Sequence, residues 1–402
     1  MNRILFVDDE KHLLDGLRRL FHPMRAEWHM SFVGSGLEAL ELLTREPFDV
    51  IVTDIRMPGM DGTQLLTRVR DRYPDMVRIV LSGHADQDLT LKATTTAHQY
   101  LSKPCDAAVL KLTIARAFAL KNSLAAPSLQ VLVAGATSLP SIPSIYLDLV
   151  RKLDYPDTSI RDVASVISHD TAMTAKVLQL ANSAFFGIRR HIVDPKDAVL
   201  YLGFDVLKAL ALSVKVFSQF KPRPGSRFSI EALTQHGLHI GILSRKIASE
   251  AGASNQDVEN SFMAGLLHDV GQLIIVDAMP DMHLDAADMA DDPGVRLWEA
   301  ERRVFATTHA EVGGYLLGLW GLPDSVVDAV AYHHEPSRCA GQRFSPLTAV
   351  HVANALGHER RNQSNGRASD LDIPYLENLN LGNKVAEWRS LIDEASLERM
   401  AV

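Results

Sequence analysis

The chain changes character near residue 125, because strand and helix signals alternate before this point and only helical patterns follow it. The predicted strands cover residues 3–7, 30–33, 50–53, 77–81 and 99–101. Strands that alternate with helices favour a doubly wound parallel sheet with helices on both faces. The later helical patterns are joined by mostly short connections, as in helix bundles. We therefore predict an α/β domain with five parallel strands, followed by an all-α domain.

A helical pattern and a proline place the domain boundary. The pattern covers Ala107–Asn122, and the next residues read as a linker because Pro127 would stop the helix. A length of 402 residues is enough for two or three domains. We predict a first domain at residues 1–122, a linker at 123–127 and a helical domain at 128–402.

Charge and cysteine content exclude several classes of protein. The net charge is -8, and residues 1–125 hold equal numbers of basic and acidic side chains, so the acidic excess lies entirely in the second part. This balance argues against direct DNA binding, which needs a basic surface. The sequence has no apolar run of about 18 residues, so we predict no membrane span. Two cysteines cannot build a disulfide framework, and a reduced, cytoplasmic setting is expected.

Acidic side chains gather where the predicted strands of the first domain end. Asp8 and Asp9 follow the first strand and Asp54 follows the third, while Ser82 and Lys103 lie just beyond the last two strands. The carboxyl ends of parallel strands share one edge of a sheet, where ligands bind. Carboxylate oxygens suit Mg²⁺, and a carboxylate can accept a phosphoryl group as an acyl phosphate. A hydroxyl and a lysine can then hold the phosphoryl oxygens.

Residues 1–122 resemble a response-regulator receiver domain, a flavodoxin-like fold. The resemblance rests on VDDE at 7–10, TDIRMPGMDG at 53–62, LSG at 81–83 and LSKP at 101–104. The alternative, a generic nucleotide-binding α/β domain, lacks a glycine-rich phosphate loop. The resemblance implies a sensor histidine kinase as partner and the following roles: Asp54 as phosphoacceptor; Asp8, Asp9, Asp54 and the backbone carbonyl of Arg56 as Mg²⁺ ligands; Ser82, Tyr100 and Lys103 as switch residues; Pro104 in a cis-proline turn.

Histidines are concentrated in the second part, which holds eleven of the sixteen. Several fall within or at the ends of predicted helices: His236, His268 with Asp269, His309, and His333 with His334. Imidazole and carboxylate ligands on facing helices are a common way to build a metal site. Adjacent residues on a helix point about 100° apart, so these pairs suit a site between helices or two metal ions.

This order of residues resembles the HD superfamily of metal-dependent phosphohydrolases. The resemblance implies iron, manganese or zinc bound by His236, His268, Asp269, His309, His333 and His334, with Asn354 in the place of the last family aspartate. Gln272 stands where the cyclic-di-GMP-cleaving HD-GYP branch has lysine, and residues 333–346 contain no GYP motif. A cyclic-di-GMP phosphodiesterase is therefore not expected. The alternative to a metal site is a hydrogen-bonded polar pocket without an ion.

The rest of the second part resembles HDOD domains, helical signalling modules without established catalysis. The matching segments are LPSIP at 139–143 and the blocks at 169–187, 198–212 and 320–323. The remaining histidines are expected at the surface or at domain boundaries: His169, His191, His239, His283, His351 and His358.

The resemblances lead to one interpretation and two alternatives. We expect a response regulator in which phosphorylation of Asp54 switches an HDOD output, with an unknown downstream protein as partner and a homodimer on activation. The first alternative is a phosphorylation-gated metal-dependent phosphohydrolase acting on a nucleotide or cyclic dinucleotide. The second is an HDOD domain that binds a nucleotide without cleaving it.

Overall fold

The computed structural model divides the chain into two compact units. One comprises residues 1–144 with Gly318–Gly321, and the other comprises the remainder. The structure describes residues 2–82, 96–103, 105–123, 144–153, 158–168, 173–174, 177–178, 192–218, 220, 227–292, 294–339, 341, 343–361 and 369–391. Most of the predicted linker, Pro104, His169, His191, the LPSIP segment and most of the 169–187 block lie outside these residues.

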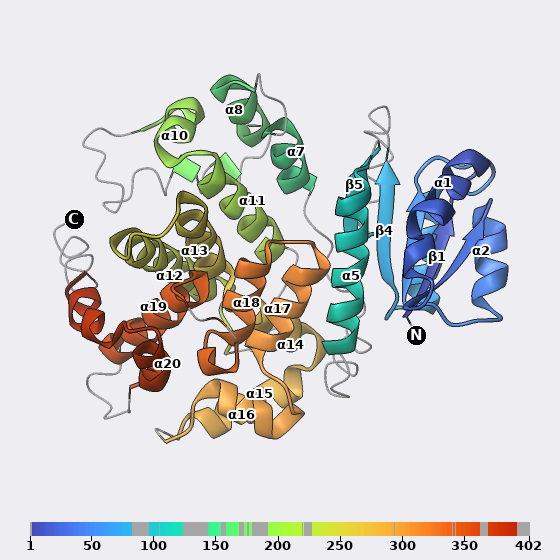
Figure 1. The fold of residues 1–402 in the computed structure, drawn as a ribbon. Coiled ribbons are helices and arrows are strands. Elements are labelled where there is room, and N and C mark those ends of the chain that lie inside the picture. The colour runs from blue at the N-terminus through green and yellow to red at the C-terminus, as the bar shows by residue number, and fades with distance from the viewer. Residues whose placement is uncertain are drawn as a thin grey trace. The chain divides into compact units, whose positions relative to one another are not determined.

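The first unit is built on a parallel sheet of five strands (Figure 1). The strands are β1 (Asn2–Val7), β2 (Trp28–Val33), β3 (Val50–Asp54), β4 (Val77–Ser82) and β5 (Gln99–Ser102), in the order β2-β1-β3-β4-β5. The described helices are α1 (Lys11–Phe21), α2 (Gly36–Leu43), α3 (Gly62–Arg72) and α5 (Ala107–Ser123), with a 3-10 turn at His22–Met24. This order is the flavodoxin-like one and confirms the predicted fold class.

Burial explains the shape of this sheet. Along β1, Ile4 to Val7 are at most 1% exposed, and Val50 to Val52 of β3 are equally buried. Central strands of a parallel sheet are covered on both faces, so they read as continuous apolar runs and not as alternating patterns. Helix α3 starts with a reciprocal cap between Asp61 and Gln64, which fixes the end of the loop that follows β3.

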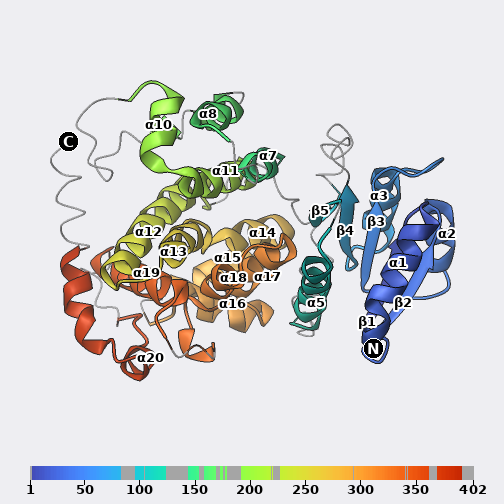
Figure 2. The same ribbon diagram turned by 45° about the horizontal axis from the view of Figure 1, so that its top comes forward.

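The second unit is helical throughout its described residues (Figures 1 and 2). Its helices are α7 (Ser144–Leu153), α8 (Ile160–Ser168), α10 (Pro195–Leu202), α11 (Phe204–Ser218), α12 (Ile230–Glu250), α13 (Asn255–Leu267), α14 (Val270–Ala278), α15 (Pro280–Ala290), α16 (Leu297–Phe305), α17 (His309–Leu319), α18 (Asp324–Tyr332), α19 (Pro346–Arg361) and α20 (Ile373–Asn378), with 3-10 turns at Pro336–Arg338 and Gly382–Lys384. Helix α12 lies alongside α13 in both views.

Periodicity alone predicts one continuous helix over residues 257–276, whereas the structure breaks this stretch at His268 and Asp269. Apolar residues continue on both sides of this turn, so the periodicity conceals it. By length and hydropathy the stretch Asn255–Ala278 could cross a membrane, but 72% of its most apolar window is buried, as in a core helix. The described residues therefore indicate no membrane span.

Glycines allow α12 and α13 to approach backbone to backbone. A Cβ atom at Gly265 of α13 would lie 2.7 Å from the Cα of Gly241 on α12, and a Cβ at Gly241 would lie 2.9 Å from the carbonyl oxygen of Phe262. Gly237, one turn earlier, faces the carbonyl oxygen of Leu266 in the same way. This contact brings His236 on α12 close to the turn at the end of α13, where His268 and Asp269 lie.

Candidate functional site

The carboxyl edge of the sheet brings together the predicted acidic residues. Ligand oxygens of Asp8, Asp9 and Asp54 all lie within 4.8 Å of one another. The Lys103 Nζ atom lies 2.8 Å from Asp8 Oδ2 and 2.8 Å from Asp54 Oδ1. The backbone N–H of Glu10 donates to Asp8 Oδ1 at 2.8 Å. Asp8 and Asp54 are buried, whereas Asp9 is exposed, so the cluster is open to solvent on one side.

One lysine, Lys103, pairs with two buried carboxylates at this edge. Burial raises the pKa of Asp54, and the hydrogen bond from Lys103 offsets only part of this effect. Burial would lower the pKa of Lys103, but its hydrogen bonds to Asp54 and Asp8 outweigh burial and raise that pKa. The site therefore has more negative than positive charge and can accept a further cation.

The loop after β3 depends on glycine. A Cβ atom at Gly62 would overlap the carbonyl oxygen of Asp54, and the Gly62 N–H donates to the carbonyl of Ile55 at 2.9 Å. Gly59 has a φ of 79°, in the region that favours glycine. The GMDG part of the sequence motif thus keeps the loop tight against the end of β3.

The other predicted residues of this edge lie where the strands end. Arg56 follows β3 and is exposed, Ser82 is the last residue of β4, and Lys103 directly follows β5. Tyr100 lies within β5 and is half-buried against the core beneath the sheet.

Asp269 lies at the centre of a second cluster, formed by histidines of the helical unit. Its Oδ2 atom is 3.3 Å from His268 Nε2 and 3.8 Å from His236 Nε2. Its Oδ1 atom is 3.1 Å from His309 Nε2 and 3.9 Å from His333 Nε2. His334 Nε2 lies 3.0 Å from His309 Nε2. We call the set His236, His268, Asp269, His309, His333 and His334 the histidine pocket.

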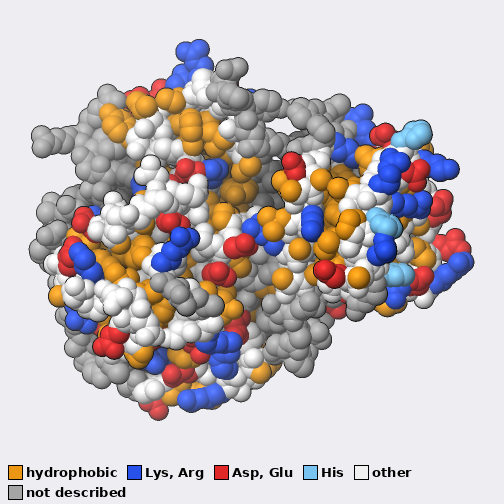
Figure 3. Space-filling model, viewed as in Figure 1, with side chains coloured by type: hydrophobic (Ala, Val, Ile, Leu, Met, Phe, Trp, Pro, Cys, Tyr) orange, Lys and Arg blue, Asp and Glu red, His pale blue; other side chains and the backbone are white. Residues whose placement is uncertain are grey.

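The pocket lies between helices: His236 lies within α12, and the other members come from helix ends and turns. His309 begins α17, while His333 and His334 follow α18. A Cβ atom at Gly271 would overlap the carbonyl oxygen of His309, so this glycine lets α14 and α17 meet beside Asp269. Space-filling shows no histidine over the helical unit on the face drawn in Figure 3.

The histidines present lone pairs to Asp269. His268 Nδ1 lies 2.8 Å from the carbonyl of Gly265, and His333 Nδ1 lies 2.8 Å from the carbonyl of Val330. A carbonyl oxygen only accepts, so both Nδ1 atoms carry a proton, and in a neutral imidazole each Nε2 atom then carries a lone pair. These buried Nε2 atoms have no hydrogen-bond partner among the described residues. Lone pairs that face a carboxylate repel it unless a cation stands between them.

Charge in the pocket is unevenly distributed. Burial would raise the pKa of Asp269, but His268 and His309 outweigh burial and hold that pKa well below its usual range. Burial would lower the pKa of His309, yet Glu301 and Asp269 raise it to about 10. Burial and the neighbouring histidines lower the pKa of His333 and His334. Without a metal ion, a protonated His309 therefore places a positive charge 3.1 Å from Asp269.

Asn354 belongs to α19, which packs against both α12 and α13. Its side chain is 4% exposed, and its Oδ1 atom has no hydrogen-bond partner among the described residues. As a metal ligand, its amide oxygen would be neutral and would add no negative charge to a cation site.

Two histidines expected at the surface are buried, so those predictions are wrong. His351 is 1% exposed; its Nδ1 donates to the carbonyl of His333 at 2.8 Å and its Nε2 accepts from the backbone N–H of Asp372 at 2.9 Å. Both its nitrogens are occupied, so it supports the backbone beside the pocket and is no ligand. His283 is 9% exposed, and its ring packs edge-on against Phe228 at 5.9 Å.

The donor set fits a transition-metal ion. Imidazole lone pairs and one carboxylate suit zinc, iron or manganese better than a purely oxygen-ligated cation. Ligand atoms of His236, His268 and Asp269 lie within 4.8 Å of one another, and so do those of His309, His333 and His334. Asp269 faces both groups, one oxygen to each. The pocket thus offers two adjoining places for a cation.

Two known families match the chain, and each match includes one of the two candidate sites. The family model of the response regulator receiver domain matches residues 4–115, and that of the HDOD domain matches residues 139–336. The chain therefore carries a response regulator receiver domain followed by an HDOD domain. The receiver domain implies a phosphodonor such as a histidine kinase.

Individual relatives each match one part of this receiver–HDOD protein. A solved HDOD domain protein of unknown function from Geobacter sulfurreducens is 25% identical, with a TM-score of 0.52, over 66% of this chain and 97% of that one. The hydrogenase transcriptional regulatory protein HoxA of Cupriavidus necator is 42% identical over 25% of this chain and 21% of its own length. An uncharacterized protein of Treponema pallidum is 26% identical over 53% and 40%, respectively. The chain spans less than half the length of these two curated relatives.

Two functional side chains were missed by sequence reasoning because α16 was not predicted. Glu301 is completely buried, and its Oε2 atom accepts from His309 Nδ1 at 2.7 Å. Trp298 stacks on His334 with ring centroids 5.7 Å apart. Trp298, Glu301 and Phe305 recur at helical spacing, so periodicity could have found the helix. A buried glutamate on its inner face would then have pointed to the pocket.

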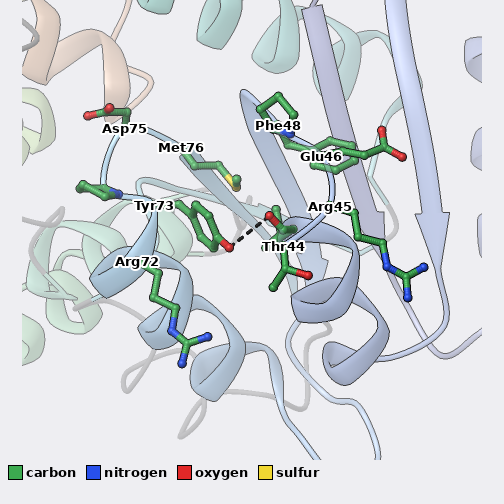
Figure 4. A pocket seen from close by; sticks show the side chains of 11 residues that line it. Thr44, Arg45, Glu46, Phe48, Arg72, Tyr73, Asp75 and Met76 are labelled. Carbon is green, nitrogen blue, oxygen red and sulfur yellow. Dashed lines mark hydrogen bonds between the residues drawn. The ribbon is translucent and has the colours of Figure 1, made fainter.

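A further pocket, of about 430 Å³, lies in the receiver domain at the edge of the sheet opposite Asp54 (Figure 4). It is lined by the segments before β3 and β4, residues 43–48 and 72–76. The Tyr73 hydroxyl donates across it to the carbonyl of Leu43 at 3.1 Å. It contains no member of either candidate site.

Proposed function

We propose that this protein is a phosphorylation-switched regulator whose HDOD domain acts by binding another protein. The observation that supports this most is Lys103, which is 2.8 Å from both Asp8 and Asp54. A sensor histidine kinase supplies the phosphoryl group to Asp54, and Mg²⁺ is held by Asp8, Asp9, Asp54 and the backbone carbonyl of Arg56. When bound, Mg²⁺ offsets the charge between the carboxylates and the incoming phosphoryl oxygens.

Phosphorylation changes the partners of Lys103 and Ser82. Phosphorylation bonds one carboxylate oxygen of Asp54 to phosphorus and removes the charge of this carboxylate, so the Lys103 ammonium group turns from the Asp8–Asp54 pair to the phosphoryl oxygens. The Ser82 hydroxyl donates to another of these oxygens, and Tyr100 on the neighbouring strand responds to the change. The output passes to the HDOD domain, with homodimerisation on activation and no direct DNA binding.

Beryllofluoride with Mg²⁺ tests this proposal, because it imitates the phosphoryl group without a kinase. We expect it to change the hydrodynamic radius of the full chain, or the hydrogen-exchange protection of residues between the domains. Asp54→Asn should abolish the change, and Asp75→Asn, a charge-matched exposed control, should preserve it. A change of the same size in Asp54→Asn would refute Asp54 as the phosphoacceptor.

A second candidate function is metal-dependent phosphoester hydrolysis in the histidine pocket. It is favoured by the Nε2 atoms of His268 and His333, which face Asp269 and have no hydrogen-bond partner in the described part of the chain. The histidine pocket would hold the ion, which would activate water and polarise a phosphoryl oxygen. The neutral Asn354 and Gln272 count against turnover. A pocket that binds a nucleotide without cleaving it is the remaining alternative.

Elemental analysis of the purified protein separates these candidates. Stoichiometric iron, manganese or zinc that is lost in Asp269→Ala would support the metal pocket, whereas metal-free protein from careful purification would exclude the enzyme. Calorimetry with cyclic dinucleotides tests binding without cleavage, and absence of heat at micromolar concentrations would dismiss it.

A further inference from the structure

Helix α16 contacts the histidine pocket at two of its members. Glu301 and Trp298 are three residues apart, so both point to the same side of the helix. Glu301 reaches His309, and Trp298 covers His334 with the two rings inclined by 18°. Both histidines belong to the same group of metal-compatible atoms, together with His333.

Glu301 makes a two-point contact with His309. One oxygen, Oε2, accepts from the ring Nδ1 at 2.7 Å and from the backbone N–H of His309 at 2.8 Å. The ring is therefore held relative to its own backbone, with Nδ1 protonated and Nε2 directed at Asp269. A carboxylate on the distal nitrogen of a metal-binding histidine fixes its orientation and increases its basicity.

Charged side chains hold α16 in this place. Arg302, beside Glu301, binds Glu311 on α17 at 3.2 Å and also Glu335, the residue after His334. Arg296, at the start of α16, binds Asp370. The helix is thus tied to the segments that carry His309 and His334, so Glu301 does not depend on its own hydrogen bonds for its position.

We propose that Glu301 is a positioning residue that sets the cation affinity of the group formed by His309, His333 and His334. The proposal rests on the metal pocket proposed above and adds a residue outside the implied ligand set. Glu301 holds the lone pair of His309 toward the cation, and Trp298 covers the group from one side.

The test uses Co²⁺ and the full chain, first stripped of metal. Co²⁺ binding is followed by its visible absorption and by tryptophan fluorescence. Glu301→Gln keeps an acceptor for His309 but removes the charge, and we expect it to weaken Co²⁺ binding roughly 10- to 100-fold and to shift the absorption spectrum. Glu299→Gln, a charge-matched change on the same helix, should leave both unchanged.

The outcomes distinguish the two proposals. Equal Co²⁺ affinity and spectra in wild type and Glu301→Gln would overturn the role of Glu301 while leaving the metal pocket in place. No Co²⁺ uptake by the wild type would overturn the metal pocket as well. If Glu301→Gln fails to fold, Trp298→Phe decides: its loss of Co²⁺-induced fluorescence quenching places the cation beside α16, and unchanged quenching contradicts the proposal.

Discussion

At the scale of single residues, the number of carboxylates limits what the histidine pocket can hold. The group around His236 and His268 has one carboxylate, Asp269, which it shares with the other group. Two divalent cations next to one shared carboxylate repel each other with little compensation. For the metal pocket proposed above, we therefore expect a single tightly bound cation.

Restoring a carboxylate at position 354 should change this stoichiometry. We expect Asn354→Asp to raise Co²⁺ or Mn²⁺ binding from one ion to two per chain, measured by elemental analysis after dialysis. Without metal, the same variant should be less stable by about 1–3 kcal/mol, because the new charge is buried without a partner. Asn378→Asp, at an exposed position, is the control for added charge. One ion per chain in both variants would contradict the reasoning.

His98 in the receiver domain predicts a pH dependence of stability. Burial lowers the pKa of His98 well below its usual range, and the nearby Arg78, whose Nη2 lies 2.8 Å from His98 Nε2, lowers it further. Below about pH 6.5, His98 therefore binds a proton in the unfolded chain but not in the folded domain. Folding stability should fall by at most about 1.4 kcal/mol for each pH unit below that value.

Denaturant unfolding at about pH 7.5 and about pH 5.5 measures this loss. The folding stability of His98→Gln should depend less on pH than that of the wild type. His12→Gln, a change at an exposed histidine, should leave the pH dependence of stability unchanged. An unchanged slope in His98→Gln would show that other groups cause the pH dependence.

At the scale of elements, the apolar patterns predicted the regular strands and missed a turn that interrupts a helical stretch. The strand bounds agree closely with the sequence prediction, because short apolar runs bounded by polar residues allow few alternative bounds. The turn at His268 and Asp269 was hidden because apolar residues flank it on both sides. Motifs identified the pocket residues, but Glu301 lies outside all of these motifs, and its role depends on where α16 packs.

The close contact of α12 and α13 predicts opposite effects of alanine at two helical glycines. Gly265→Ala should cost about 1–3 kcal/mol, because its Cβ would lie 2.7 Å from Gly241 and the helices must separate. Gly16→Ala on α1, where nothing lies within 4 Å, should stabilise by roughly 0.5–1 kcal/mol. Denaturant unfolding followed by circular dichroism measures both. Equal effects at the two positions would contradict the packing argument.

At the scale of the whole molecule, each unit has a candidate binding site of its own. The receiver core is closed around the sheet, with residues such as Leu5, Ile51 and Leu65 fully buried within it. The histidine pocket is built from helices of the other unit only. A ligand for one site should therefore stabilise its own unit first.

Thermal unfolding should accordingly occur in two transitions with different ligand responses. Beryllofluoride with Mg²⁺ should raise the receiver transition, and Co²⁺ at about 100 times its Kd should raise the HDOD transition by roughly 5–10 °C. Calorimetry of the full chain measures both, with Asp54→Asn and Asp269→Ala as the respective controls. A single transition shifted equally by either ligand would show that the two units unfold as one.

The position of Asp269 has a consequence for how such a pocket can change through evolution. Among the described residues, Asp269 faces His236 and His268 with one oxygen and His309 and His333 with the other. Loss of a single outer histidine weakens one half, whereas loss of Asp269 disconnects both halves together. In lineages that abandon cation binding, the histidines should therefore disappear one by one, and Asp269 should be the last to be replaced.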